Sequence, residues 1–211
     1  MAWTTVITDS QPGFSSADYE NNAYQFLLYF SGYMTASAMA GILGNIQYES
    51  YLNPGQQELG RGGDTEFGYG LIQWTPARDF IAWCNARGFT WSDGDVQCYR
   101  IKCEGERTDG CSGLWFGKNG YNYTWSEFCQ LNDYEEAVKA YFYERERGTW
   151  NSLRLDFAED WYNWIYSGTP VPGPGPTPPT PDPGGGSSTR PFWYGGVRDL
   201  MRRGVISNGK L

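Results

Sequence analysis

Apolar residues recur every three or four positions in two stretches near the start of the chain, which predicts two helices. The first covers residues 16–33 with Ser16 as its cap, and the second covers residues 35–50 with Thr35 as its cap. Glu49 falls on the apolar stripe of the second helix, so an acidic side chain is expected on an apolar face. The two stripes consist of Ala23, Phe26, Leu27 and Phe30, and of Ala38, Met39, Ile42, Leu43 and Ile46.

The pattern changes over residues 53–74, where helix breakers are followed by frequent glycines. Strand-like pieces at 66–67 and 71–73 predict a small β-hairpin after a glycine-rich loop. Thr75-Pro76 then predicts the start of a helix that runs to about residue 87, because threonine caps helices and proline suits the first helical position.

Further helices are expected closer to the C-terminus, at 94–103, 124–131, 133–147 and 151–166. Asp133 and Glu136 have the spacing of a capping box. The inward face of the last helix is predicted to consist of Leu153, Phe157, Trp161, Trp164 and Ile165.

These elements predict an α+β fold that is mostly α-helical, in a domain at 16–168 preceded by an extended leader at 1–15. Residues 169–189 are rich in proline, glycine and serine and are expected to form a linker. Residues 190–211 are too few to fold alone. Their basic and aromatic residues predict a segment that docks on a partner.

The chain contains no histidine. This absence excludes the Ser-His-Asp triad and the Cys-His dyad, and it leaves no histidine for a zinc site of the metallopeptidase kind. Chemistry on this sequence is therefore expected to use carboxylates, with no metal and no cofactor.

The formal net charge of −8 argues against a nucleic-acid partner, since phosphate neutralisation needs clustered Lys and Arg. The charge is uneven: residues 187–211 carry five basic residues and one acidic residue, which gives +4 and leaves −12 for the rest. No apolar run is long enough to span a membrane, and no secretory signal is recognised at the N-terminus.

Five cysteines lie at 84, 98, 103, 111 and 129, and without a signal peptide they are expected as thiols. If the protein is oxidised after release from a cell, Cys103 and Cys111 are the favoured pair because they flank a short polar turn.

Glu49 is the predicted general acid. Partial desolvation at the end of an apolar stripe disfavours the charged form of a carboxyl group, which helps it keep a proton near neutral pH. A glycosidase mechanism with two carboxylates needs a second acidic residue beside Glu49. For this role Asp64 is slightly favoured over Glu66, and Glu58 is a weaker candidate. A single-acid mechanism of the transglycosylase kind stays open.

The segments AGILGNIQYESYLNP and GYGLIQWT resemble the phage tail-tip lysozyme family, over roughly residues 18–166. They are more distantly similar to goose-type lysozymes and lytic transglycosylases. The resemblance implies a small α-rich lysozyme fold that cuts the β-1,4 bond of peptidoglycan. It also implies Glu49 as the acid, Gln73 and Trp74 as cleft residues, Tyr69 as a sugar contact, and Arg78 as a family arginine that supports the hairpin.

The sequence thus predicts a lysozyme in the tail of a phage particle, with peptidoglycan glycan strands as substrate. Residues 190–211 would bind other tail proteins. The alternatives are a lytic transglycosylase, a secreted endolysin whose C-terminal segment binds the wall, and a non-catalytic wall-binding tail protein.

Overall fold

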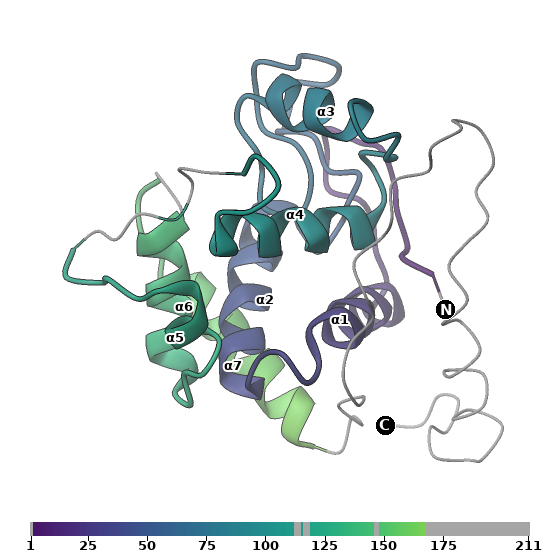
Figure 1. Ribbon diagram of the computed structural model, residues 1–211. Coiled ribbons are helices and arrows are strands. Elements are labelled where there is room, and N and C mark those ends of the chain that lie inside the picture. Colours follow the sequence, from purple (N-terminus) through teal and green to yellow (C-terminus); the bar gives the residue numbers. More distant parts are fainter. Residues whose placement is uncertain (1, 112–114, 116–118, 146–147, 168–211) are drawn as a thin grey trace, which may run out of the picture.

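The computed structural model describes residues 2–111, 115, 119–145 and 148–167 (Figure 1). The predicted linker at 169–189 and the predicted docking segment at 190–211 lie outside the described residues. The described part is mostly helical, as predicted. Its helices are α1 (Ser16–Phe30), α2 (Ala36–Ser50), α3 (Ala77–Asn85), α4 (Gly94–Glu106), α5 (Trp125–Phe128), α6 (Tyr134–Arg145) and α7 (Leu153–Tyr166).

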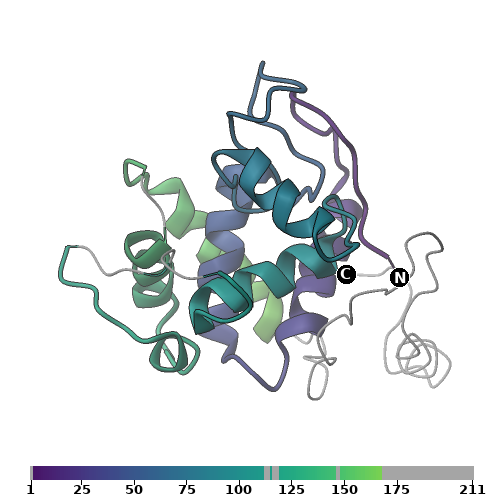
Figure 2. The same cartoon turned by 45° about the horizontal axis from the view of Figure 1, so that its top comes forward.

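Helix α2 is the central element of the domain. It packs most extensively against α7 and α6, and it also contacts α1, which in turn packs on α4 (Figures 1 and 2). The segment at 53–76 and helix α3 lie beyond the C-terminal end of α2 (Figure 1). The position that follows the last turn of α2 is therefore the junction between the helical body and the irregular segment.

Two glycines let neighbouring helices approach α2 closely. A Cβ atom on Gly41 would lie 2.7 Å from the backbone of Ala137 in α6, and one on Gly44 would lie 2.5 Å from the Arg154 carbonyl oxygen in α7. Both distances are shorter than real Cβ contacts. The glycines of the AGILGN segment thus set the spacing between α2 and the two helices that pack on it.

The predicted helix starts are confirmed at Thr35, whose side chain caps α2, and at residue 94, where α4 begins, but those of α1 and α3 differ. Ser15, not Ser16, caps α1 through a capping box with Asp18. Pro76 takes the cap position of α3, and the Thr75 hydroxyl donates to the Gln73 carbonyl instead of capping the helix.

The predicted capping box at the start of α6 is half present. Asp133 accepts hydrogen bonds from the backbone N–H groups of Glu135 and Glu136. The Glu136 carboxylate accepts from the Tyr123 hydroxyl instead of reaching back to the cap.

The predicted inward face of α7 is confirmed at Trp161 and Ile165 and is wrong at the start of the helix. Leu153 is 48% exposed, whereas the buried residues are Arg154, Ala158, Trp161 and Ile165. In the first two turns, the apolar residues Leu153 and Phe157 led the prediction to the face next to the buried one. As a result, an arginine lies on the buried stripe of this helix.

In place of the predicted hairpin, the described residues contain isolated β-bridges. Tyr69 pairs with Gln57 and with Trp74, and the predicted strand pieces are turns. The leader is extended and lies along the same segment, because Thr8 pairs with Gln56 and the Asn53 side chain bonds both the N–H and the carbonyl of Val6.

All five cysteines are buried free thiols. Cys103 and Cys111, the pair favoured from the sequence, are hydrogen-bonded to each other, and this bond lowers the pKa of Cys103 to about 7. In the described part of the chain, no helix is both long and apolar enough to cross a membrane.

Candidate active site

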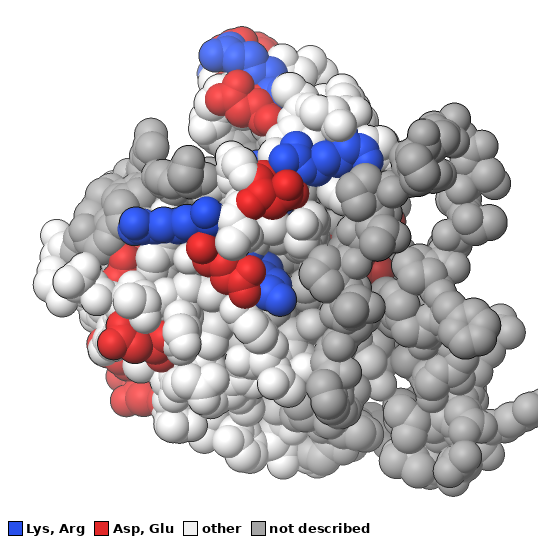
Figure 3. All heavy atoms as spheres, viewed as in Figure 1, with Lys and Arg blue, Asp and Glu red and all other residues white. Residues whose placement is uncertain are grey.

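A pocket of about 740 Å³ opens where α2 ends and the irregular segment begins. Its volume is within the range of small-molecule sites. The lining includes Glu49 from α2, Glu58, Gln73 and Trp74 from the irregular segment, and Arg100 and Arg145 from α4 and α6. Acidic and basic side chains lie next to one another on the face that carries α3 and α4 (Figure 3).

Glu49 is fixed at the edge of this pocket by the way α2 ends. Tyr51 and Leu52 both adopt left-handed backbone with φ of 57°, which stops the helix directly after Ser50. The buried Ser50 hydroxyl lies 2.8 Å from the Leu71 carbonyl oxygen, to which it donates, and this contact fastens the helix end to the irregular segment. Glu49 therefore lines the pocket, and Ser50 fastens the end of α2 to the segment that forms the pocket wall.

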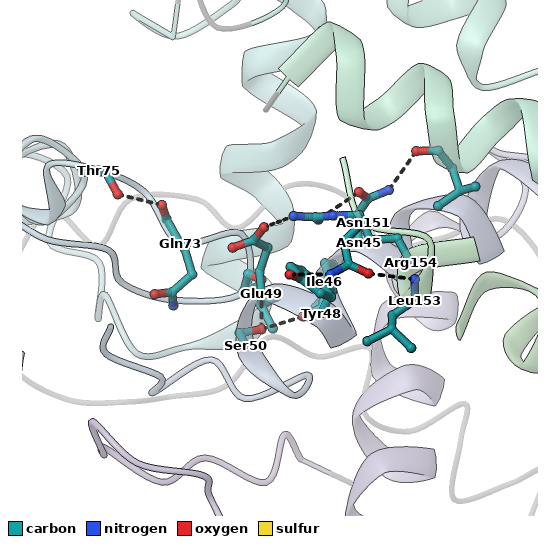
Figure 4. A network of polar contacts seen from close by, with 12 residues as sticks. Asn45, Ile46, Tyr48, Glu49, Ser50, Gln73, Thr75, Asn151, Leu153 and Arg154 are labelled. Carbon is teal, nitrogen blue, oxygen red and sulfur yellow. Dashed lines mark hydrogen bonds and ion pairs between the residues drawn. The ribbon is translucent and has the colours of Figure 1, made fainter. Parts of the chain in front are cut away.

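The Glu49 side chain is 19% exposed and forms an ion pair between its Oε1 and Nη2 of Arg154. The Arg154 side chain is 3% exposed. In Figure 4 the Glu49 carboxylate points toward Arg154, and Gln73 lies on its other side. One carboxylate oxygen is thus held by a buried cation at the edge of an open pocket.

Arg154 is itself held by the helices around it. Its Nη1 donates to Asn45 Oδ1 at 3.0 Å, and Asn45 Nδ2 donates to the Gly41 and Val138 carbonyls (Figure 4). The guanidinium lies 4.2 Å from the centroid of the Tyr48 ring. Arg154 is not among the site residues predicted from the sequence, although its position four residues before Ala158 and seven before Trp161 places it on the buried stripe of α7.

Gln73 and Trp74, for which the resemblance implies a role in the cleft, both line the pocket. Gln73 has a φ of 49°, and its side-chain amide donates to the Gly70 carbonyl at 3.0 Å. Trp74 is only 4% exposed and stacks on Phe80, with 4.2 Å between ring centroids. Its indole therefore contributes an edge to the pocket more than an open face.

The pocket wall behind Trp74 contains a buried ionic cluster. Glu104 is 1% exposed and accepts from Trp74 Nε1 and Arg100 Nε at 2.7 Å and from Arg145 Nε at 2.8 Å. Charge-assisted hydrogen bonds of this kind fix side-chain geometry strongly. The indole edge and the two guanidinium groups are therefore held in place before any ligand binds.

Tyr69 is not among the described residues that line the pocket. It is 3% exposed and packs edge-on against Trp91, with 4.7 Å between ring centroids. The structure places it in the core behind the pocket wall.

Asp64 and Glu66 are exposed and are also absent from the described pocket lining. Asp64 accepts a hydrogen bond from the Glu66 backbone N–H at 3.0 Å, within a turn. Glu66 forms an ion pair with Arg78, whose backbone N–H donates to the Thr65 carbonyl. Arg78 thus contacts the loop that carries both predicted carboxylates.

Glu58 lines the pocket together with Glu49. Its Oε2 accepts a hydrogen bond from the Gly68 backbone N–H at 3.0 Å. Among the predicted partners, the residue ranked lowest is therefore the one that the structure brings to the pocket.

A family model described as phage tail lysozyme matches residues 18–165. The chain belongs to the phage tail lysozyme family. The matched span contains most of α1, all of α2 and every pocket residue named above. The resemblance found in the two sequence segments is thereby confirmed.

One curated relative of this phage tail lysozyme domain is Morphogenesis protein 1 of Bacillus phage B103. The two are 33% identical over 131 residues, which is 61% of this chain and 34% of the relative. The chain therefore spans about a third of the length of this relative.

Proposed function

We propose that this protein is a lysozyme of the phage particle that cleaves the β-1,4 glycosidic bonds of host peptidoglycan. Its place is the tail tip, where cleavage opens the cell wall during genome entry. The observation that carries the proposal is Glu49, held by a buried arginine at the edge of a pocket in a phage tail lysozyme domain.

Glu49 lines the pocket at a position from which its carboxyl group, once protonated, can pass the proton to a glycosidic oxygen. Arg154 holds Oε1, so the side chain keeps one orientation, and within the described residues the second oxygen has no hydrogen-bond partner. Gln73 and Trp74 would position the sugar beside it, since both line the same pocket. Preorganisation of this kind lowers the barrier because the acid need not be oriented during the reaction.

The direct test is the Glu49→Gln variant, which keeps the shape of the side chain and loses its ionisable proton. We expect clearing of purified peptidoglycan to fall at least about a hundredfold, the usual contribution of a general acid. Glu135→Gln is a matched control, because Glu135 is an exposed carboxylate on α6. Equal clearing by wild type and Glu49→Gln would refute the catalytic role.

A lytic transglycosylase is the second candidate, because neither Asp64 nor Glu66 is in the described pocket lining. In that reaction a hydroxyl group of the sugar attacks, and the product ends in an anhydro ring. Mass spectrometry of the released fragments separates the two reactions by the mass of one water molecule.

Association with the phage particle is supported by the family and by a relative named for morphogenesis. We propose that residues 190–211 bind other tail proteins. A secreted endolysin would instead use this segment to bind the wall, and a wall-binding tail protein would show no cleavage at all.

A further inference from the structure

We propose that Glu58 is the second catalytic carboxylate and that it activates the attacking water. The inference rests on the proposed function and adds to it the residue that makes the reaction a hydrolysis. It starts from one juxtaposition: Glu49 and Glu58 come from different segments and line the same pocket.

Glu58 is held firmly, as a catalytic group has to be. Its backbone N–H donates to the Gly68 carbonyl at 2.9 Å, and the Gly68 N–H donates back to Glu58 Oε2 at 3.0 Å. The adjacent bridge between Gln57 and Tyr69 continues the same pairing. One carboxylate oxygen is thus anchored to backbone, and among the described residues the other has no hydrogen-bond partner.

Gly68 allows this arrangement by having no side chain. A Cβ atom there would lie 2.7 Å from Gln73 Oε1. Gln73 therefore packs directly over the residue that anchors Glu58, and both side chains line the pocket. The anchor of Glu58 and one pocket wall are built from the same few residues.

The other acidic residues near the pocket are less suited to this role. Asp64 caps its own turn, and Glu66 pairs with Arg78 outside the described pocket lining. Asp79 lines the pocket, but its side chain is 74% exposed and lies 3.7 Å from Arg78. In the described residues, Glu58 is the pocket acid that a backbone N–H group holds.

The reaction balances with these two groups. Glu49 donates its proton to the departing glycosidic oxygen as the bond from that oxygen to the anomeric carbon breaks. Water forms the new bond to this carbon and gives up one proton to Glu58. One water is consumed, no oxidant or reductant is needed, and solvent then returns the proton from Glu58 to Glu49.

The test compares Glu58→Gln with wild type on purified soluble glycan strands. Glutamine can still accept the Gly68 hydrogen bond, so the loop keeps its anchor. We expect kcat to fall at least about a hundredfold with little change in KM, because the lost group acts on water in the transition state. Asp64→Asn and Glu66→Gln are parallel variants and are expected to lose much less.

A second variant covers the case in which Glu58→Gln alters the loop. Glu58→Ala leaves space for a small anion, so added sodium formate should restore part of the activity, whereas sodium chloride should not. Thermal melting of each variant reports whether the fold is kept.

Three results would overturn the assignment: wild-type kcat in Glu58→Gln, a larger loss in Asp64→Asn or Glu66→Gln, or anhydro products from the wild type. If Glu49→Gln is inactive while Glu58→Gln is fully active, Glu49 remains the acid and only the Glu58 assignment fails. If Glu49→Gln is also fully active, the proposed function itself fails.

Discussion

Glu49 and Arg154 are 105 positions apart in the chain and meet because α2 and α7 pack on each other. Burying a guanidinium is unfavourable unless its charge is compensated. Arg154 is compensated by Glu49, by Asn45 and by the face of Tyr48. We therefore expect this arginine to position the acid rather than to serve only the stability of the core.

Arg154→Met should separate the two roles. Loss of the guanidinium frees the Glu49 carboxylate, so kcat on glycan strands should fall at least tenfold while KM changes little. Loss of charged hydrogen bonds should also lower the free energy of unfolding, by about 1.5–3 kcal/mol. Arg154→Lys keeps the charge and should recover part of kcat.

A purely structural arginine would give a different pattern. Both variants would then lose stability, and the folded fraction of each would have the kcat of wild type. Steady-state kinetics combined with urea unfolding distinguishes the two cases.

Glu49 could be predicted as a site residue from the sequence, because the 3.6-residue period of α2 places it on the same stripe as Ile42 and Ile46. The sequence did not predict Arg154, because Leu153 and Phe157 suggested the neighbouring face of α7. Asp64 ranked above Glu58 because Asp64 lies on the predicted hairpin, and only the path of the loop shows which residue lines the pocket.

At the scale of elements, the distance between α2 and α7 is set by Gly44, where a Cβ atom would meet Arg154 and Ala158 of α7. Gly44→Ala raises helix propensity, so an effect of propensity alone would stabilise α2. We expect the opposite. Overpacking against α7 should lower the free energy of unfolding by about 1–3 kcal/mol.

Urea unfolding of Gly44→Ala and Gly148→Ala provides the comparison. A Cβ atom on Gly148 would meet nothing within 4 Å, so this variant is the control for stability. A Gly44→Ala protein as stable as the control would mean that α7 can move away from α2 without loss.

The sequence predicted the existence and order of the helices, because their stripes and caps are local signals. It predicted strands at 66–67 and 71–73 where the structure has turns and isolated bridges. Bonds between distant segments override the local pattern there, as in the contact of the Ser50 hydroxyl with the Leu71 carbonyl. Such contacts cannot be predicted from the spacing of residues along the chain.

At the scale of the whole molecule, charge is divided between residues 1–186, with −12, and residues 187–211, with +4. The anionic part is poorly suited to adhere to an anionic wall by electrostatics alone. A tail particle that delivers the domain to the wall would remove the need for such adhesion.

Deletion of residues 190–211 tests whether the domain alone cleaves the glycan strands while this segment attaches it to the particle. We expect the shortened protein to cleave purified glycan strands at the wild-type rate and to be lost from assembled particles. Immunoblotting of purified particles and a cleavage assay give the two measurements. Weaker binding to intact walls, in a protein that is absent from wild-type particles as well, would favour the endolysin alternative.

The most direct test of the central claim is product analysis by mass spectrometry after digestion of purified peptidoglycan with wild type and Glu49→Gln. The account predicts disaccharide-peptide fragments with hydrated reducing ends from wild type and almost none from Glu49→Gln. Anhydro ends from wild type would contradict hydrolysis, and equal release by both proteins would contradict the role of Glu49.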